Sequence, residues 1–233
     1  LSAYEVQYSE NRQFFTEGTE LFDKGDLVYS RRIGSTFGEV SYNDETEEVV
    51  SSPSAAPLIN ATKISGRNGE GWGLGFLNAL TNKTHANIRN IETAETREEQ
   101  VDPLTNFNVL VVDKILKNNS NVNLINTNVT RLDGDNDANV TGASVSLLDS
   151  TNTYRFSAFG AVSNIYNAED AGVSSELEDG YKYSVGLSKV SGSFQYGVSR
   201  NVESKDYDPN DFGFNRAANS VSQNVSLMYR IFK

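Results

Sequence analysis

The stretch DGYKYSVGLSKVSGSFQYGVSRNVES, residues 179–204, decides the fold class of this chain. Apolar side chains alternate with polar or small ones on both sides of a Ser191-Gly192 turn. The apolar set is Tyr181, Tyr183, Val185, Leu187, Phe194, Tyr196, Val198 and Val202, and the alternate set is Lys182, Ser184, Gly186, Ser188, Gln195, Gly197, Ser199 and Asn201. Successive side chains of a strand point to opposite faces, so the pattern predicts a two-faced β-hairpin. A soluble sandwich produces such a hairpin, and so does a transmembrane barrel with lipid outside and a wet lumen inside.

The spacing of turns and loops favours the barrel. Between turns and loops lie about ten strand candidates of roughly 9–13 residues, whereas sandwich strands are usually nearer 5–6 residues. Transmembrane barrels combine short turns on one side of the membrane with long loops on the other. We therefore predict an all-β fold over residues 57–233, an antiparallel transmembrane β-barrel or a segment of one. The short turns are 67–69, 118–120, 150–152 and 191–192, and the long polar loops are 83–104, 132–138, 167–178 and 203–219.

The first part of the chain, residues 1–56, lacks a regular period and is predicted to be an irregular segment. Two interpretations are open. The segment is a plug inside the lumen, or it contributes a first strand at Leu27–Ile33 followed by an acidic loop over 34–57. In either case we expect regular strands only beyond it.

One predicted strand carries a face of very small residues, Gly73, Gly75 and Ala79. Glycine weakens a strand unless another part of the chain approaches closely. We therefore expect a segment to pack against this face, with Phe14-Phe15 as the candidate.

The composition of the chain argues against several classes of function. Apolar residues make up 37%, low for a chain whose strands are buried on both sides. The net charge of −11 argues against nucleic acid as a partner. Cysteine is absent, and the single histidine, His85, lies in a polar stretch, so neither a thiolate metal site nor a Ser-His pair is expected. No stretch approaches the 18 or more apolar residues of a membrane helix. We predict a protein that is not an enzyme and has no cofactor.

A weak metal candidate lies in LDGDNDA, where Asp133, Asp135 and Asp137 occupy alternate positions. Calcium favours such carboxylate spacing, but the glycine at the sixth position and the distal glutamate of a calcium loop are missing. A solvated turn is the favoured interpretation.

Four charged residues near the N-terminus are candidates for the lumen: Arg31, Arg32, Glu17 and Glu20. The arginines are expected to pair with Glu17 or Glu20. Structural ion pairing inside a plugged barrel is favoured over a conducting or substrate-binding lumen. Nothing positions the two glutamates as the carboxylate pair that glycoside hydrolysis needs.

Asparagine is frequent in the predicted strands and creates several Asn-x-Ser/Thr sequons. We interpret them as a coincidence of an Asn/Thr-rich chain rather than as modification sites. They start at Asn60, Asn82, Asn128, Asn139 and Asn224.

Five segments, in this order, resemble a family of Bacteroidota outer-membrane proteins of unknown function: NRQFFTEGTELF, LVYSRRIG, INATKISGRNGEGWGLGFLNALT, VDPLTNFNVLVV and DYDPNDFGF. Members carry a module resembling the family-9 carbohydrate-binding modules, followed by a β-barrel. The resemblance implies an outer-membrane location and a barrel longer than this chain. The sugar-binding module has no counterpart in these residues, and members continue with more strands after the point that matches Arg230–Lys233.

Together these observations predict a non-enzymatic protein of the bacterial outer membrane. We expect a subunit of an envelope assembly or transport system, with outer-membrane lipid and other envelope proteins as partners. Two alternatives stay open. One is a carbohydrate-active or carbohydrate-binding outer-membrane protein, and the other is a soluble β-sandwich binding module.

Overall fold

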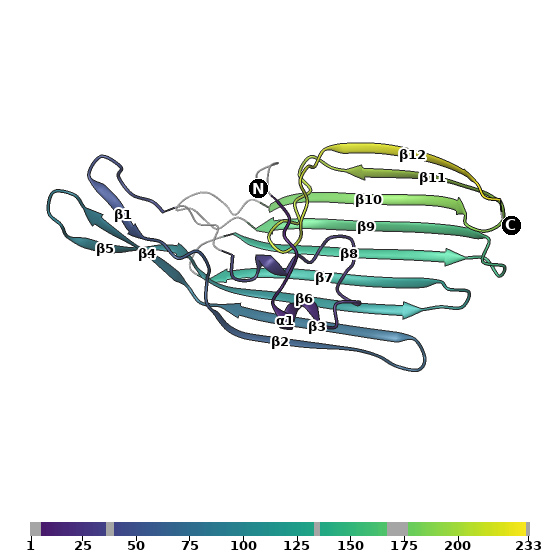
Figure 1. Cartoon of the computed structure of the whole chain (residues 1–233), viewed down its shortest axis with the longest axis horizontal. Coiled ribbons are helices and arrows are strands. Elements are labelled where there is room, and N and C mark those ends of the chain that lie inside the picture. Colours follow the sequence, from purple (N-terminus) through teal and green to yellow (C-terminus); the bar gives the residue numbers. More distant parts are fainter. Residues whose placement is uncertain (1–5, 36–39, 133–135, 167–176, 232–233) are drawn as a thin grey trace.

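The computed structural model describes residues 6–35, 40–132, 136–166 and 177–231. The chain forms two antiparallel sheets with almost no helix (Figure 1). The larger sheet has nine strands in the order β12-β11-β10-β9-β8-β7-β6-β3-β2. Each strand therefore pairs with its predecessor along the chain, except that β3 pairs with β6. The all-β antiparallel prediction is confirmed.

The strands of the larger sheet are 10–13 residues long. Their bounds are β2 (Leu58–Arg67), β3 (Trp72–Thr81), β6 (Leu104–Ile115), β7 (Asn121–Leu132), β8 (Asp137–Leu148), β9 (Tyr154–Tyr166), β10 (Leu177–Lys189), β11 (Phe194–Glu203) and β12 (Ser220–Tyr229). The predicted short turns at 67–69, 118–120, 150–152 and 191–192 lie where β2 meets β3, β6 meets β7, β8 meets β9 and β10 meets β11.

The smaller sheet extends beyond one end of the larger one (Figure 1). It consists of β1 (Glu47–Ser51), β4 (Thr84–Asn90) and β5 (Thr96–Asp102) in the order β1-β4-β5. The loops predicted for 34–57 and 83–104 were therefore wrong over these strands. Ala86 and Ile88 of β4 are buried at alternate positions, and opposite charges on neighbouring strands pair beside them. Arg97 contacts Glu47 at 2.9 Å, and Arg89 pairs with Glu48.

The N-terminal segment contains one short helix, α1 (Gln13–Thr16), and a single 3-10 turn, η1 (Ser30–Arg32). The strand predicted at Leu27–Ile33 was wrong. Both of its end residues are buried, but the chain between them turns, with the Arg32 amide donating to the Tyr29 carbonyl at 2.9 Å. A strand needs a ladder of such bonds to a neighbour, and this segment has none in the parts of the chain that the structure describes.

The two faces of the larger sheet differ. We call the face that carries the N-terminal segment the inner face and the opposite one the outer face. On β3 the inner side chains are Gly73, Gly75 and Leu77, whereas Trp72 and Leu74 point outward. One apolar core cluster joins inner-face residues to the N-terminal segment and to the loop between β11 and β12.

The larger sheet does not close on itself within the described residues, because β2 and β12 are its two edges and do not pair with each other. The short turns gather at one end of the sheet, which we call the turn end (Figure 1). The small sheet and the loop between β11 and β12 lie at the other, the arm end. No helix in the described ranges is long and apolar enough to cross a membrane.

Candidate functional site

Two segments far apart in sequence cover part of the inner face. They are residues 6–35 and the β11–β12 loop, residues 204–219, and together we call them the inner cover. Figure 1 draws both across the same side of the large sheet. The core cluster places cover residues on sheet residues: Phe15, Leu21, Phe22, Leu27, Ile33, Tyr207 and Phe212 against Leu77, Ala79, Phe107, Val109, Val111, Ile125, Val129, Ala138, Val140 and Ala161.

Glycines on the inner face allow this close contact. A Cβ on Gly73 would lie 2.9 Å from Leu21, and one on Gly75 would lie 3.1 Å from Phe22. A Cβ on Gly142 of β8 would lie 2.7 Å from Leu27. The predicted packing against the Gly73/Gly75 face is thus present, but Leu21 and Phe22 make it in place of Phe14-Phe15. Any larger side chain at these positions would displace the cover.

The two parts of the cover are bonded to each other. The Tyr29 amide donates to the Phe212 carbonyl at 2.7 Å, and the Phe214 amide donates to the Asp26 carbonyl at 3.1 Å. The Tyr29 and Phe214 rings meet edge to face with centroids 5.3 Å apart. These contacts make the cover one packed unit rather than two separate loops.

The loop part of the cover is anchored by Tyr207, which is 2% exposed. Lys182 of β10 lies over its ring, 5.9 Å from the centroid. Burial, followed by the nearby carboxylates of Glu203, Asp26 and Asp208, raises the pKa of Tyr207. The phenol therefore stays neutral and serves as a packing group.

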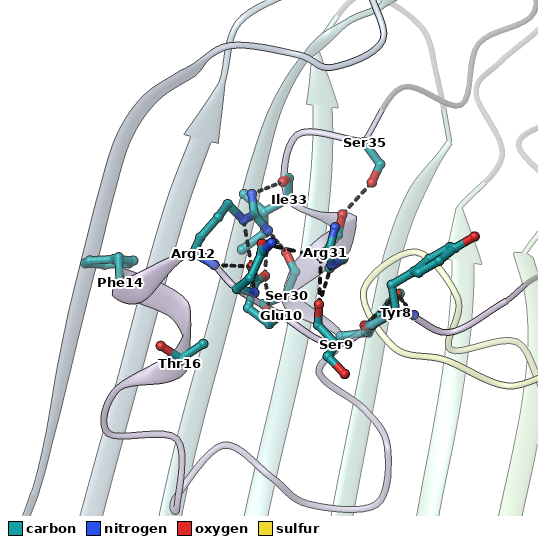
Figure 2. A network of polar contacts seen from close by, with 12 residues as sticks. Tyr8, Ser9, Glu10, Arg12, Phe14, Thr16, Ser30, Arg31, Ile33 and Ser35 are labelled. Atoms are coloured by element: carbon teal, nitrogen blue, oxygen red, sulfur yellow. Dashed lines mark hydrogen bonds and ion pairs between the residues drawn. The ribbon is translucent and has the colours of Figure 1, made fainter.

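A polar network ties the beginning of the segment to η1 (Figure 2). The Arg12 guanidinium contacts the Glu10 carboxylate at 2.8 Å and donates to the Ile33 and Ser30 carbonyls at 2.8 Å each. The Ser30 hydroxyl donates to Glu10 at 2.7 Å. Every strong donor here points at a group of the same segment, which indicates a structural network.

The network also fixes the charge of Glu10. Burial opposes ionisation, but the hydrogen bonds from Arg12, then from Ser30, outweigh it and lower the pKa of Glu10 to about 2. A carboxylate held this firmly in its charged form is poorly suited to exchange protons near neutral pH. Beside it lies a recess of about 540 Å³ lined by Gln7, Tyr8, Ser9, Glu10, Phe15, Thr16, Thr19, Phe22, Asp23, Val28, Tyr29, Ser30, Lys63 and Leu77.

The structure places the two candidate arginines in different environments. The Arg31 side chain donates to the Ser9 carbonyl at 2.7 Å and lies at the rim of the segment (Figure 2). Arg32 is 2% exposed, donates to the Gly213 carbonyl at 3.3 Å, and lies over the rings of Tyr29 and Phe214. Arg32 thus belongs to the joint between the two parts of the cover.

The two candidate glutamates have partners other than Arg31. Glu17 accepts a hydrogen bond from Gln13 at 2.9 Å. Glu20 lies 3.4 Å from Arg67 of β2, and its own side chain is largely exposed. Glu20 therefore forms its ion pair with Arg67, and Glu10, not Glu17 or Glu20, pairs with Arg12.

An ion pair between the buried Asp113 and the more exposed Arg67 lies on the inner face and was not predicted from the sequence. Arg67 of β2 reaches past Gly73 of β3 to Asp113 of β6, at 2.5 Å. Strand register sets this pair, because Arg67 lies opposite Gly73 and Gly73 lies opposite Asp113. Only a residue without a side chain between the two leaves room for the contact.

The weak metal candidate is only partly described. Asp133 and Asp135 lie outside the described residues. An oxygen of Asp137 accepts the Arg131 amide at 2.8 Å, as expected for a hairpin turn. In the described part of the chain, no three His, Cys, Asp or Glu side chains lie close enough to hold a metal ion.

The outer face carries no cover in the described structure, and large apolar side chains lie exposed along it. Its centre and turn end form what we call the apolar band: Trp72, Leu74, Phe76, Leu110, Val112, Val122, Leu124, Val145, Leu147, Phe156, Val162, Tyr181, Val185, Leu187, Tyr196, Val198, Val225 and Leu227. On β11 and β12 the band ends at Arg200 and Gln223, closer to the turn end than on the other strands. A monomeric soluble protein rarely exposes a contiguous apolar patch of this extent.

The fold and the inner cover define a class: a long-stranded antiparallel sheet whose inner face is partly covered by its own chain and whose outer face is apolar. The chain belongs to the family described as Domain of unknown function (DUF5916), whose model matches residues 1–233. No curated protein and no solved structure matches it.

Proposed function

We propose that this chain forms part of the wall of a transmembrane β-barrel in a bacterial outer membrane. The observation that carries the proposal is the contrast between the two faces of the sheet. The outer face is bare yet carries a broad apolar band, whereas the inner face is apolar beneath the chain's own cover and small or polar on β10 to β12. Strands of 10–13 residues, at about 3.3 Å per residue, are about 33–43 Å long. The strands therefore match or exceed the roughly 9–11 residues that a tilted strand needs to cross the hydrocarbon core.

The open edges fit the same proposal. Unpaired backbone groups on β2 and β12 would be costly in lipid, so both edges need partner strands in the membrane. Large side chains on β12, such as Val225 and Leu227, are more than 70% exposed, which supports a missing neighbour. Further strands, from this or another polypeptide, would complete the wall.

The role we propose is non-enzymatic, as a subunit of an envelope assembly or transport system. The inner cover occupies the space that a pore would use, and its polar groups bond to one another. The proposed partners are lipid at the apolar band and envelope proteins at the strand edges and the small sheet.

A charge on each face of one strand tests the membrane proposal. Val198→Arg puts a cation in the apolar band, whereas its neighbour Ser199→Arg puts the same cation on the inner face. Near mid-depth we expect the first to cost about 2–4 kcal/mol of membrane stability and the second much less. The readouts are insertion of the full chain into vesicles and a shift in gel mobility on boiling in SDS.

Equal tolerance of both variants, or a full chain that remains in the aqueous phase without lipid, would support a soluble β-sandwich. Purification from native membranes tests the assembly role separately. We expect recovery with other envelope proteins in fixed stoichiometry, and recovery of the chain alone would contradict the assembly role while leaving the membrane proposal intact.

A further inference from the structure

Five asparagines form one continuous row across the outer face. Strand register sets each directly opposite the next: Asn78 on β3, Asn108 on β6, Asn128 on β7, Asn139 on β8 and Asn164 on β9. The row continues to Thr62 on β2 and Asp179 on β10. We call these five residues the asparagine row. Asparagine is unfavourable in strands, so five in register call for a physical reason.

The row points away from the core. Its members alternate along the strands with buried inner-face residues such as Ala79, Val109 and Val129, and each is only partly buried. Further polar residues lie on both sides of the row on the outer face. They are Asn106 and Thr130 toward the arm end and Asn126 and Thr141 toward the turn end. The result is a polar strip next to the apolar band on the same face.

The amides bond to one another and remain partly open. Asn78 donates to both Asn106 and Asn108 at 2.8 Å, and Asn164 donates to Asp179 at 2.6 Å. Asn126 donates to Asn139 at 3.0 Å. Each amide offers two donor hydrogens and an oxygen with two lone pairs, so these contacts leave capacity for a ligand.

The charge of the strip selects the ligand chemistry. Neither the row nor the flanking rows contain lysine or arginine in the strand register, and Asp179 and Asp137 are acidic. Phosphate recognition relies on cations or helix N-termini, and the strip offers neither. Neutral hydroxyl groups, which both donate and accept, match an array of carboxamides.

The apolar band next to the row indicates a lipid ligand rather than a free sugar. On the outer side of β6, Leu110 lies next to Asn108 toward the turn end, and Val162 lies next to Asn164 in the same direction on β9. A molecule that contacts band and row together has an acyl part on the band and a hydroxylated part on the row. A free sugar would use only the strip.

We propose that the asparagine row binds the neutral sugar headgroup of a membrane glycolipid whose acyl chains lie on the apolar band. The row then marks the depth at which the hydrocarbon core ends, on the arm-end side. This inference rests on the proposed membrane function and adds a lipid class to it.

The test uses the full chain reconstituted in phosphatidylcholine nanodiscs that contain digalactosyldiacylglycerol or, as the comparison, phosphatidylglycerol. Native mass spectrometry of the protein released from the discs reports the lipid retained. We expect preferential retention of the glycolipid. The double change Asn128→Leu with Asn139→Leu should reduce that retention about tenfold, as for loss of two modest hydrogen bonds.

Two controls keep the result interpretable. Gln223→Leu removes an outward amide on β12 away from the row and should leave retention unchanged. Asn128→Thr with Asn139→Thr raises strand propensity and replaces each amide with a single hydroxyl, so it tests the row if the leucine variant fails to fold. We expect the threonine variant also to lose the glycolipid preference.

Several outcomes would overturn the inference. They are equal retention of the two lipids, binding of free digalactose as tightly as the glycolipid, or a concentration-dependent dimer abolished by the same substitutions. Failure of the proposed function looks different, since the unaltered chain would then fail to insert into any nanodisc.

Discussion

The inner face of the large sheet has two halves that differ in composition. On β6 to β8, its residues include Val109, Val111 and Ile125, which are fully buried beneath the inner cover. On β10 to β12, the residues in the same orientation are small or polar: Ser184, Gly186, Ser188, Gly197, Ser199, Ser222, Asn224 and Ser226. On the outer face, by contrast, the apolar band runs across both halves, beside the asparagine row.

The comparison shows what each environment requires. Apolar side chains occur on the inner face where the chain's own segments cover it, and polar ones occur where nothing in the described structure does. A soluble protein would need the polar residues on its bare outer face as well. Under the proposed membrane function, water on the uncovered inner half and lipid on the outer face would account for both patterns.

The largest effect should come from truncation beneath the cover. Ile125→Ala removes a fully buried side chain on the inner face of β7, and we expect a loss of about 2–5 kcal/mol in the free energy of unfolding. Met228→Ala on the inner face of β12, where the side chain is half-exposed, should stay within about 0.5 kcal/mol. Urea titration of the folded chain measures both. Similar losses would show that the two halves are equally packed.

A smaller effect is expected from adding one methyl group. Gly142→Ala directs a Cβ against Leu27 of the cover and Ile125, and overpacking should cost about 1–3 kcal/mol. Gly160→Ala on the outer face meets no atom within 4 Å and should be close to neutral. Thermal unfolding of the two variants side by side provides the measurement. An equal cost would mean that the cover does not press on β8.

The smallest effect concerns pH. Glu10 has a pKa lowered from 4.5 to about 2, so its contribution to docking of the cover is present above about pH 4.5 and is lost as the pH falls toward 2. Hydrogen exchange of residues 6–35, corrected for intrinsic rates, should accelerate over that window. Exchange on β10 to β12 should not follow it. In Glu10→Gln the acceleration should be absent, and its persistence would assign the effect to another group.

The strands of the large sheet could be predicted from the sequence because turn residues separate long runs, and in most of these runs apolar residues alternate with polar or small ones. β1, β4 and β5 could not. Their stability depends on cross-strand pairs such as Arg97–Glu47, and charge-rich segments such as TREEQVD resemble loops in composition. The partner of each charge lies on a strand whose position only the fold determines.

The inner cover was predicted in outline, as an irregular segment against small residues on β3. Its partners were not, because Arg32 meets Gly213 and Arg67 meets Asp113 across long sequence separations. The asparagine row was hidden for a related reason. Its members are 30, 20, 11 and 25 residues apart, and only register aligns them. Two of them, Asn128 and Asn139, were interpreted as coincidental sequons.

The bond between Arg32 and Gly213 joins residues 181 positions apart. The first part of the cover is made early in synthesis, but its partner loop follows β11. Residues 6–35 can therefore pack fully only after β2 to β11 and the β11–β12 loop have been made. Until then the apolar side chains of Leu27 and Phe22 remain exposed to solvent. Closing so long a loop early is entropically unfavourable, so the beginning of the chain should be among the last parts to reach its place. A factor that shields this segment during biogenesis would thus act on residues 6–35, even though the slow step belongs to the β11–β12 hairpin.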